Sequence, residues 1–180
     1  MFETTGRTAG AESRPAKTVR KIERLRKALR HEEPDRVPVS DFFWGGFVRR
    51  WRAELNLPPG ANPYHHYDLD FIVTVPNMDP WIRPFETLRE DDREVVVKTG
   101  FGAVMHKVFD LPMPEMRSWE VDTLEKLEQA EFDAPRDPRR FLSAGDNHIA
   151  GVGDGFERNS PAWIETVKSL WPDFAVYGSM

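Results

Sequence analysis

The chain has 180 residues, enough for one domain with a hydrophobic core, and 31% of them are charged. A formal net charge of -5 argues against a dedicated nucleic-acid-binding protein, because such proteins are usually basic. The absence of cysteine excludes disulfides and thiolate metal sites built from this chain.

The N-terminal residues 1–17 are rich in Thr, Gly, Ala and Ser and show no periodicity, which predicts a disordered lead before a domain spanning residues 18–180. They lack the apolar stretch of a secretory signal. No apolar run in the chain approaches the roughly 20 residues that a membrane-spanning helix needs. We therefore expect a cytoplasmic protein that binds neither membranes nor nucleic acid.

The first predicted helix begins near Thr18, as a capping residue, and ends near Glu32, before Pro34. Apolar residues recur at helical spacing and predict the inward face of this helix: Ile22, Leu25 and Leu29. The basic residues lie mostly on the opposite face, which we expect to be exposed to solvent: Arg20, Lys21, Arg24, Lys27 and Arg30.

Two segments read as buried strands. Residues 37–43 form a short apolar run, and residues 70–76 form the clearest strand of the chain. The continuous apolar character of residues 70–76 suits a parallel strand that is covered on both faces. Between the two strands we predict a helix over residues 47–55 and one helical turn over residues 64–69.

The next region differs in character. Residues 85–90, 94–99 and 103–109 predict three antiparallel strands joined by turns at 91–93 and 100–102, which form a β-flap at about 85–109.

The last third of the chain predicts short helices followed by another strand. Residues 122–130 form a helix with Leu124 and Leu127 facing inward, and residues 137–142 are also helical. A glycine-rich loop at 151–155 precedes a helix that starts at Ser160-Pro161 and reaches Leu170. Residues 174–177 begin a further strand. This alternation of helices and strands predicts an α/β fold.

The order of these segments resembles that of a known enzyme superfamily. The stretches "EEPDRVPVSDFFW" (32–44) and "YDLDFIVTVPNMDPW" (67–81) resemble the opening of the uroporphyrinogen decarboxylase superfamily. The flap and its continuation (85–141) are similar to the corrinoid-linked methyltransferase branch of that superfamily. The resemblance implies a (β/α)8 TIM barrel. Such a barrel takes about 250 residues, so we expect this chain to be its N-terminal portion, with the inserted β-flap.

Two departures from the decarboxylase pattern bear on the reaction. Decarboxylases of this superfamily carry an arginine-rich segment after the first strand, where this chain has residues 41–46 without arginine. They carry an aspartate after the second strand, where this chain has residues 74–77 and its nearest acid is Asp79. These differences favour corrinoid-linked methyl transfer, from a methylcobamide to a thiol, over tetrapyrrole decarboxylation.

Active sites of barrels lie at the carboxyl ends of the strands, and this rule selects Asp41, Trp44, Asn77 and Asp79 as candidate substrate-binding residues. Each has a structural alternative. Asp41 could instead cap the following helix, and Asn77 and Asp79 could instead bond their own backbone in a turn. A corrinoid or porphyrinoid could also pack on Trp44 or Trp81. The catalytic residues stay unassigned.

The five histidines show no metal-binding spacing, so we expect no metal or cofactor bound by this chain alone. For the complete enzyme the resemblance implies a corrinoid and zinc, with the zinc ligands on later strands. The implied partner is a small-molecule tetrapyrrole or a corrinoid protein, and a homodimer is a possible assembly. We expect the isolated chain to be inactive. The alternative is a small non-catalytic α+β ligand-binding protein.

Overall fold

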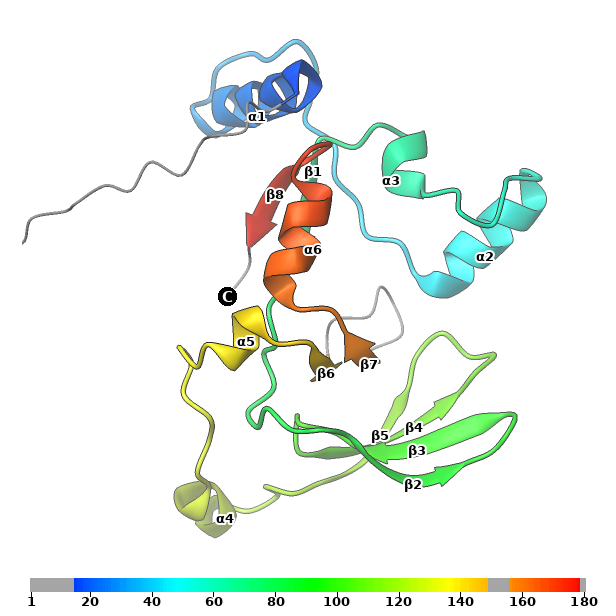
Figure 1. Cartoon of the computed structure of the whole chain (residues 1–180), viewed down its shortest axis with the longest axis vertical. Coiled ribbons are helices and arrows are strands. Elements are labelled where there is room, and N and C mark those ends of the chain that lie inside the picture. The colour runs from blue at the N-terminus through cyan, green and yellow to red at the C-terminus, as the bar shows by residue number, and fades with distance from the viewer. Residues whose placement is uncertain (1–14, 149–155, 179–180) are drawn as a thin grey trace, which may run out of the picture.

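A computed structural model describes residues 15–148 and 156–178. The chain mixes helices and strands, as predicted (Figure 1). The helices are α1 (Ala16–Leu29), α2 (Gly45–Glu54), α3 (Pro63–His66), α4 (Leu124–Gln129), α5 (Arg139–Leu142) and α6 (Trp163–Leu170). The strands are β1 (Phe71–Thr74), β2 (Glu86–Glu90), β3 (Glu94–Lys98), β4 (Ala103–Val108), β5 (Glu115–Trp119), β6 (Gly145–Asn147), β7 (Glu157–Ser160) and β8 (Ala175–Gly178).

The strands of the described part form three separate small sheets rather than a closed barrel. Strands β1 and β8 are parallel neighbours, from the pair Phe71–Ala175 to the pair Thr74–Gly178. Both strands were predicted from their apolar runs. Parallel neighbours require a long crossover connection. Here that connection contains the flap, the small β6–β7 sheet and α6, which lies beside β8 (Figure 1).

One hydrophobic core lies around the parallel pair β1 and β8. Phe43, Leu69, Ile72 and Phe174 are buried together, and side chains of α2, α3 and α6 pack against them. Phe43 also contacts Tyr64, with an edge-on ring geometry and a centroid separation of 5.2 Å. This aromatic and aliphatic cluster positions the carboxyl end of β1.

The predicted strand at residues 37–43 is wrong. Only one backbone hydrogen bond joins it to the β1 region in the described structure, from the Asp70 amide to the Val39 carbonyl at 2.8 Å. Pro38 has no amide hydrogen to donate to a strand ladder. The amide of Val39 donates to the Asp70 carboxylate at 2.8 Å instead of to a backbone carbonyl. The segment therefore lies beside β1 without pairing along it.

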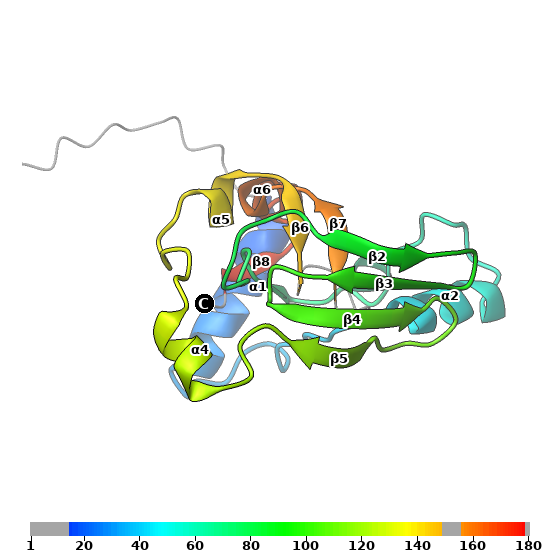
Figure 2. The same ribbon diagram turned by 90° about the horizontal axis from the view of Figure 1, so that it is seen from below.

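The β-flap is a four-stranded antiparallel sheet in the order β2–β3–β4–β5 (Figure 2). Three strands match the prediction. The fourth, β5, was not predicted, and its five residues are all exposed, as are those of β2. One face of the sheet has its own core of Val95, Val97, Ala103 and Met105.

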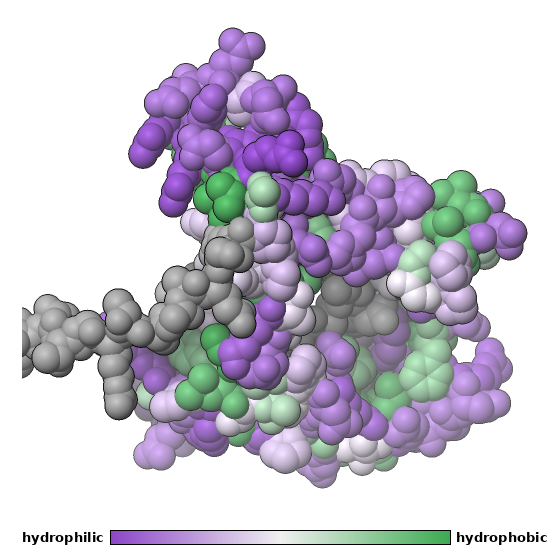
Figure 3. Space-filling view, turned by 45° about the horizontal axis from the view of Figure 1, so that its top comes forward, coloured by the Kyte–Doolittle hydropathy of each residue, from purple (hydrophilic) through white to green (hydrophobic). Residues whose placement is uncertain are grey.

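The buried face of α1 is polar, which contradicts the prediction. Leu29 is 78% exposed, whereas Thr18, Lys21 and Arg24 are buried. The Thr18 hydroxyl donates to the Pro172 carbonyl rather than capping the helix, which begins at Ala16. Lys21 donates to the carbonyl oxygens that precede β1 and β8. The helix therefore covers the amino ends of the parallel strands, where backbone carbonyls accept hydrogen bonds from its side chains. Its outer side is hydrophilic (Figure 3).

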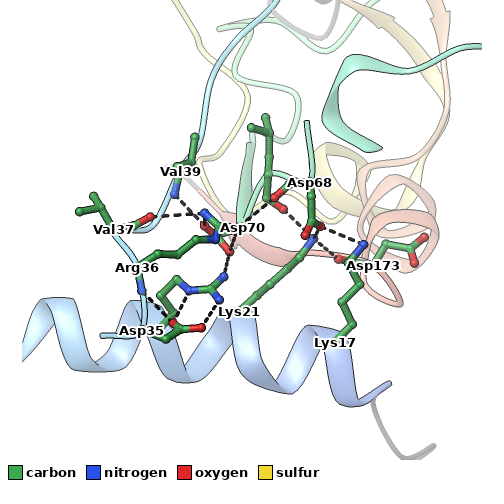
Figure 4. Close-up of polar contacts among 11 residues, drawn as sticks. Lys17, Lys21, Asp35, Arg36, Val37, Val39, Asp68, Asp70 and Asp173 are labelled. Atoms are coloured by element: carbon green, nitrogen blue, oxygen red, sulfur yellow. Dashed lines mark hydrogen bonds and ion pairs between the residues drawn. The ribbon is translucent and has the colours of Figure 1, made fainter. Parts of the chain in front are cut away.

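Arg24, Arg36 and Asp70 form an ionic cluster that we call the α1 anchor (Figure 4). The Asp70 carboxylate is fully buried and accepts from Arg24, from Arg36 at 3.0 Å and from the Val39 amide. Arg24 also bonds Asp35 and holds the pKa of that carboxyl down at about 2. The anchor ties α1, the 35–39 segment and β1 together.

Two helices are present as predicted, but one detail of each prediction is wrong. Helix α6 begins at Trp163, two residues after Pro161, and Ser160 belongs to β7 rather than capping the helix. In α4, Leu124 and Leu127 are 65% and 50% exposed and do not face a core. Residues 1–14 of the predicted lead lie outside the described residues, and so does the predicted glycine-rich loop at 151–155. Within the described ranges no helix is long and apolar enough to cross a membrane.

Candidate functional site

A cavity of about 550 Å³ opens at the carboxyl end of β1. Ligands of open α/β sheets bind in this position, beyond the carboxyl ends of the strands. Its wall combines the end of β1 and the residues after it with parts of α3, α5, α6, β6 and β7. The apolar part of the wall includes Phe42, Tyr64, Ile72, Trp163 and Leu170.

Thr74, the last residue of β1, holds three elements together at this wall. Its hydroxyl accepts a hydrogen bond from the Trp163 indole at 3.1 Å and donates to the Tyr177 carbonyl at 3.4 Å. Because the hydroxyl and the indole are satisfied by each other, they fix the shape of the cavity.

Arg140 brings a buried cation to the wall, but its guanidinium is occupied. It donates to four backbone carbonyls at 2.7 to 3.0 Å, those of Asn77, Asp79, Asp133 and Ala134. Arg140 therefore braces the turn after β1 against the segment before α5. Sequence reasoning missed this role, because the carbonyls of Asn77 and Asp79 lie 63 and 61 residues away from Arg140 in the chain.

Asn77 is the predicted site residue that lines the cavity. Its side-chain oxygen accepts from the Asp79 amide at 2.9 Å, and its side-chain nitrogen donates to the Asp146 carbonyl at 3.1 Å. The first bond is the local turn interaction weighed above as the structural alternative. Asn77 is thus held rigidly at the edge of the cavity.

Asp79 lies behind the cavity wall and is completely buried. Its carboxylate accepts from the His148 amide at 3.2 and 3.3 Å. Burial raises the pKa of Asp79 to about 7, although the His148 amide and the cations of Arg140 and Arg83 act in the opposite direction. Strongly perturbed carboxyl groups are typical of functional sites and also of structural networks.

His148 is the buried neighbour of Asp79 and is 6% exposed. Its ring stacks on Phe101 of the flap at a centroid separation of 4.4 Å. Its Nδ1 atom has no hydrogen-bond partner within the described ranges. Burial lowers the pKa of His148, so the neutral imidazole is favoured. His148 therefore joins the flap to the body as an aromatic contact.

Asp41 and Trp44 are not among the residues of the cavity wall. Asp41 accepts a hydrogen bond from the Phe42 amide at 2.7 Å. Trp44 is at the N-cap position of α2, and its ring meets the edge of Phe42 at 5.6 Å. The helix receives no side-chain cap, so the capping role considered for Asp41 is not seen. A substrate role for either residue stays a prediction.

Trp81 fixes the flap rather than presenting an open aromatic surface. A side chain at Gly102 would meet the Trp81 ring at 2.5 Å, and the indole donates to the Glu131 carbonyl at 2.8 Å. Phe132 lies on the same ring at 5.1 Å. Trp81 is half-buried, and a role for it in binding a corrinoid or porphyrinoid stays a prediction.

Two residues that sequence reasoning missed shape the site. Asp146 accepts from the amides of Phe85 and Asn159 at 2.6 and 2.9 Å, which joins the start of the flap to β7. Ser160 lines the cavity, and its hydroxyl is buried without a hydrogen-bond partner in the described part of the chain. Because Ser160 precedes Pro161, the sequence predicted a helix cap, and no pattern predicted that this residue lines a cavity.

Within residues 15–148 and 156–178, no group of three or more histidine and carboxylate side chains could hold a metal ion. Comparison with known proteins adds no relative, since no family model, no curated protein and no solved structure matches this chain.

Proposed function

We propose that this chain forms the opening part of an enzyme of the uroporphyrinogen decarboxylase superfamily with a (β/α)8 barrel. Within that superfamily we favour methyl transfer from a methylcobamide to a thiol. The partner would be a corrinoid protein, and the carboxyl end of β1 would form part of the substrate mouth.

The uncovered face of the parallel pair carries this proposal. Val73 of β1 and Tyr177 of β8 are partners in register, and their exposed fractions are 51% and 65%. Parallel strands are normally covered on both faces, because their backbone and apolar side chains need burial. Additional strands and helices would supply this cover in a barrel, and the flap after β1 fits the order of segments in the resemblance.

The charge of the cavity wall supports methyl transfer over decarboxylation of a tetrapyrrole. A substrate with several carboxylates needs cations or free donors to bind them. Arg140 is the single cationic residue among the described wall residues, and it already donates to four carbonyls. Zinc, when bound by the complete enzyme, would activate the thiol, and Asn77 would orient the substrate at the mouth.

The alternative is a small non-catalytic α+β ligand-binding protein. The cavity favours it, because its volume of about 550 Å³ already suits a small ligand. The independent core of the flap also favours it.

An assay of the purified chain tests the first proposal. The chain is incubated with methylcobalamin and coenzyme M with added zinc, and separately with uroporphyrinogen. We expect no turnover of either substrate by the isolated chain. Turnover of either would refute the expectation that the catalytic residues lie outside this chain, and turnover of uroporphyrinogen would also refute the preference for methyl transfer. In parallel, the source DNA is read past the codon for Met180. A continuous frame that places His and Cys on later strands supports the barrel enzyme. A stop codon there, together with cooperative unfolding of the chain, supports the ligand-binding protein.

A further inference from the structure

The walls of the cavity at the carboxyl end of β1 indicate the kind of molecule that it accommodates. Aromatic and aliphatic side chains supply much of the lining, with Phe42, Tyr64 and Trp163 as the rings. Its volume, about 550 Å³, lies within the range of small-molecule pockets, roughly 300 to 1,000 Å³. Apolar walls of this size favour an apolar ligand, because its transfer from water removes apolar surface.

The charged groups of the wall do not favour an anion. The guanidinium of Arg140 is directed to backbone carbonyls. The other charged residue of the described wall is the exposed Glu157, which repels anions. A carboxylate or phosphate entering this cavity would lose its hydration without gaining a cationic partner there.

Ser160 supplies a polar anchor in this wall. It is 4% exposed, and its hydroxyl has no hydrogen-bond partner among the described residues. The Thr74 hydroxyl and the Asn77 side chain, by contrast, already form hydrogen bonds within the protein. Leaving a buried hydroxyl unpaired is unfavourable, so a ligand atom that bonds it gains specificity.

The neighbour of Ser160 across the β6–β7 pair is Gly145. Directly opposed residues of antiparallel strands point to the same face, so a side chain at position 145 would lie beside Ser160. A Cβ atom at Gly145 meets no heavy atom within 4 Å, and Gly145 also lines the cavity. A larger residue there fits without a steric clash at its Cβ and occupies space next to the anchor.

We propose that this cavity binds an uncharged, mainly apolar small molecule whose single hydrogen-bonding group pairs with the Ser160 hydroxyl. This inference goes beyond the proposed function, because it rests on the cavity wall of this chain alone.

Three naphthalene probes of matched shape test the proposal by NMR titration of the purified chain at neutral pH. They are 2-naphthol, ionised 2-naphthoate and 2-methylnaphthalene. We expect 2-naphthol to bind, and 2-naphthoate to bind at least tenfold more weakly. Equal or tighter binding of 2-naphthoate, or no binding of 2-naphthol, would overturn the proposal.

Two substitutions then locate the site. Ser160→Ala should weaken 2-naphthol about fivefold and leave 2-methylnaphthalene unchanged, whereas Gly145→Leu should weaken both at least tenfold. The matched control is Ser118→Ala on the exposed strand β5, which should change neither affinity. Circular dichroism spectra check that each variant is folded. If Ser160→Ala affects both probes equally or not at all, the anchor is refuted, and if Gly145→Leu binds normally, the site is elsewhere.

Discussion

Replacing Asp70 by Asn tests the α1 anchor, the ionic cluster that holds α1 over the amino ends of the parallel strands. The substitution keeps the volume of the side chain and one acceptor oxygen, and it removes the negative charge. Arg24 and Arg36 would then face a neutral amide in place of a carboxylate. Arg24 itself is 9% exposed, so solvent replaces little of the lost interaction.

The expected cost follows from the burial of the cluster. Removing one partner of a buried ion pair typically costs about 3 to 5 kcal/mol, because the remaining charge is left without compensation. Arg24 keeps its bonds to Asp35, which reduces the loss. We therefore expect a decrease of about 3 kcal/mol in the free energy of unfolding. For a chain of this size, that corresponds to a Tm lower by roughly 6 to 12 °C.

Urea unfolding followed by circular dichroism measures this difference. Asp122→Asn is the matched control, since Asp122 pairs with Lys126 at 2.5 Å on the surface and both side chains are 52% exposed. Exposed pairs contribute less than about 1 kcal/mol. If Asp70→Asn were no more destabilising than this control, the anchor would not be what secures α1.

Three other predictions concern the junction of flap and body and the flap core. Burial raises the pKa of Asp79 to about 7 in the folded chain, so the fold favours the neutral carboxyl. This stabilisation is complete below the unfolded pKa of 3.8 and is lost as the pH rises through 7. Urea unfolding at pH 5, 6 and 7 should show that the free energy of unfolding falls more steeply with pH in the unsubstituted chain than in Asp79→Asn, by up to about 1.4 kcal/mol per pH unit. Equal slopes in the two proteins would contradict this. A Cβ at Gly100 would lie 2.3 Å from a carbonyl oxygen and 2.7 Å from the Asp79 carboxylate, so Gly100→Ala should cost about 1 to 3 kcal/mol. Gly60→Ala, where a Cβ meets nothing within 4 Å, is the control, and equal Tm values would disprove the clash. Met105→Ala, at a position 1% exposed, should cost about 2 to 5 kcal/mol by urea unfolding, whereas Met116→Ala, at 45% exposure on the next strand, should cost much less. Similar costs at the two methionines would show that the flap face does not form a core.

Local patterns predicted most of the elements of this chain. The apolar runs that contain β1 and β3 and the alternation of β4 are properties of a few neighbouring residues, and so are the turns between the flap strands. The same patterns predicted α1, α2 and α6 within a few residues of their ends. These predictions succeeded because the backbone state of such segments depends mainly on neighbours in the sequence.

The candidate site was predicted only in part. Asn77 was selected because it follows β1, and it lines the cavity. Asp79 was selected by the same rule but is buried behind the wall, where Arg140 and His148 surround it. The position of Ser160 depends on the pairing of β7 with β6, and no short sequence pattern predicted that pairing.

By itself the sequence determined most of the helices and strands and that the chain belongs to the α/β class. The tertiary structure alone decided which faces are buried. Helical spacing predicted Leu29 as an inward residue, yet Arg24 is buried in its place because it reaches Asp70, 46 residues away in the chain. Asp70 likewise binds the Val39 amide and so prevents residues 37–43 from pairing as a strand. Periodicity records a difference in polarity between two faces, whereas burial depends on the groups that a distant segment presents to each face.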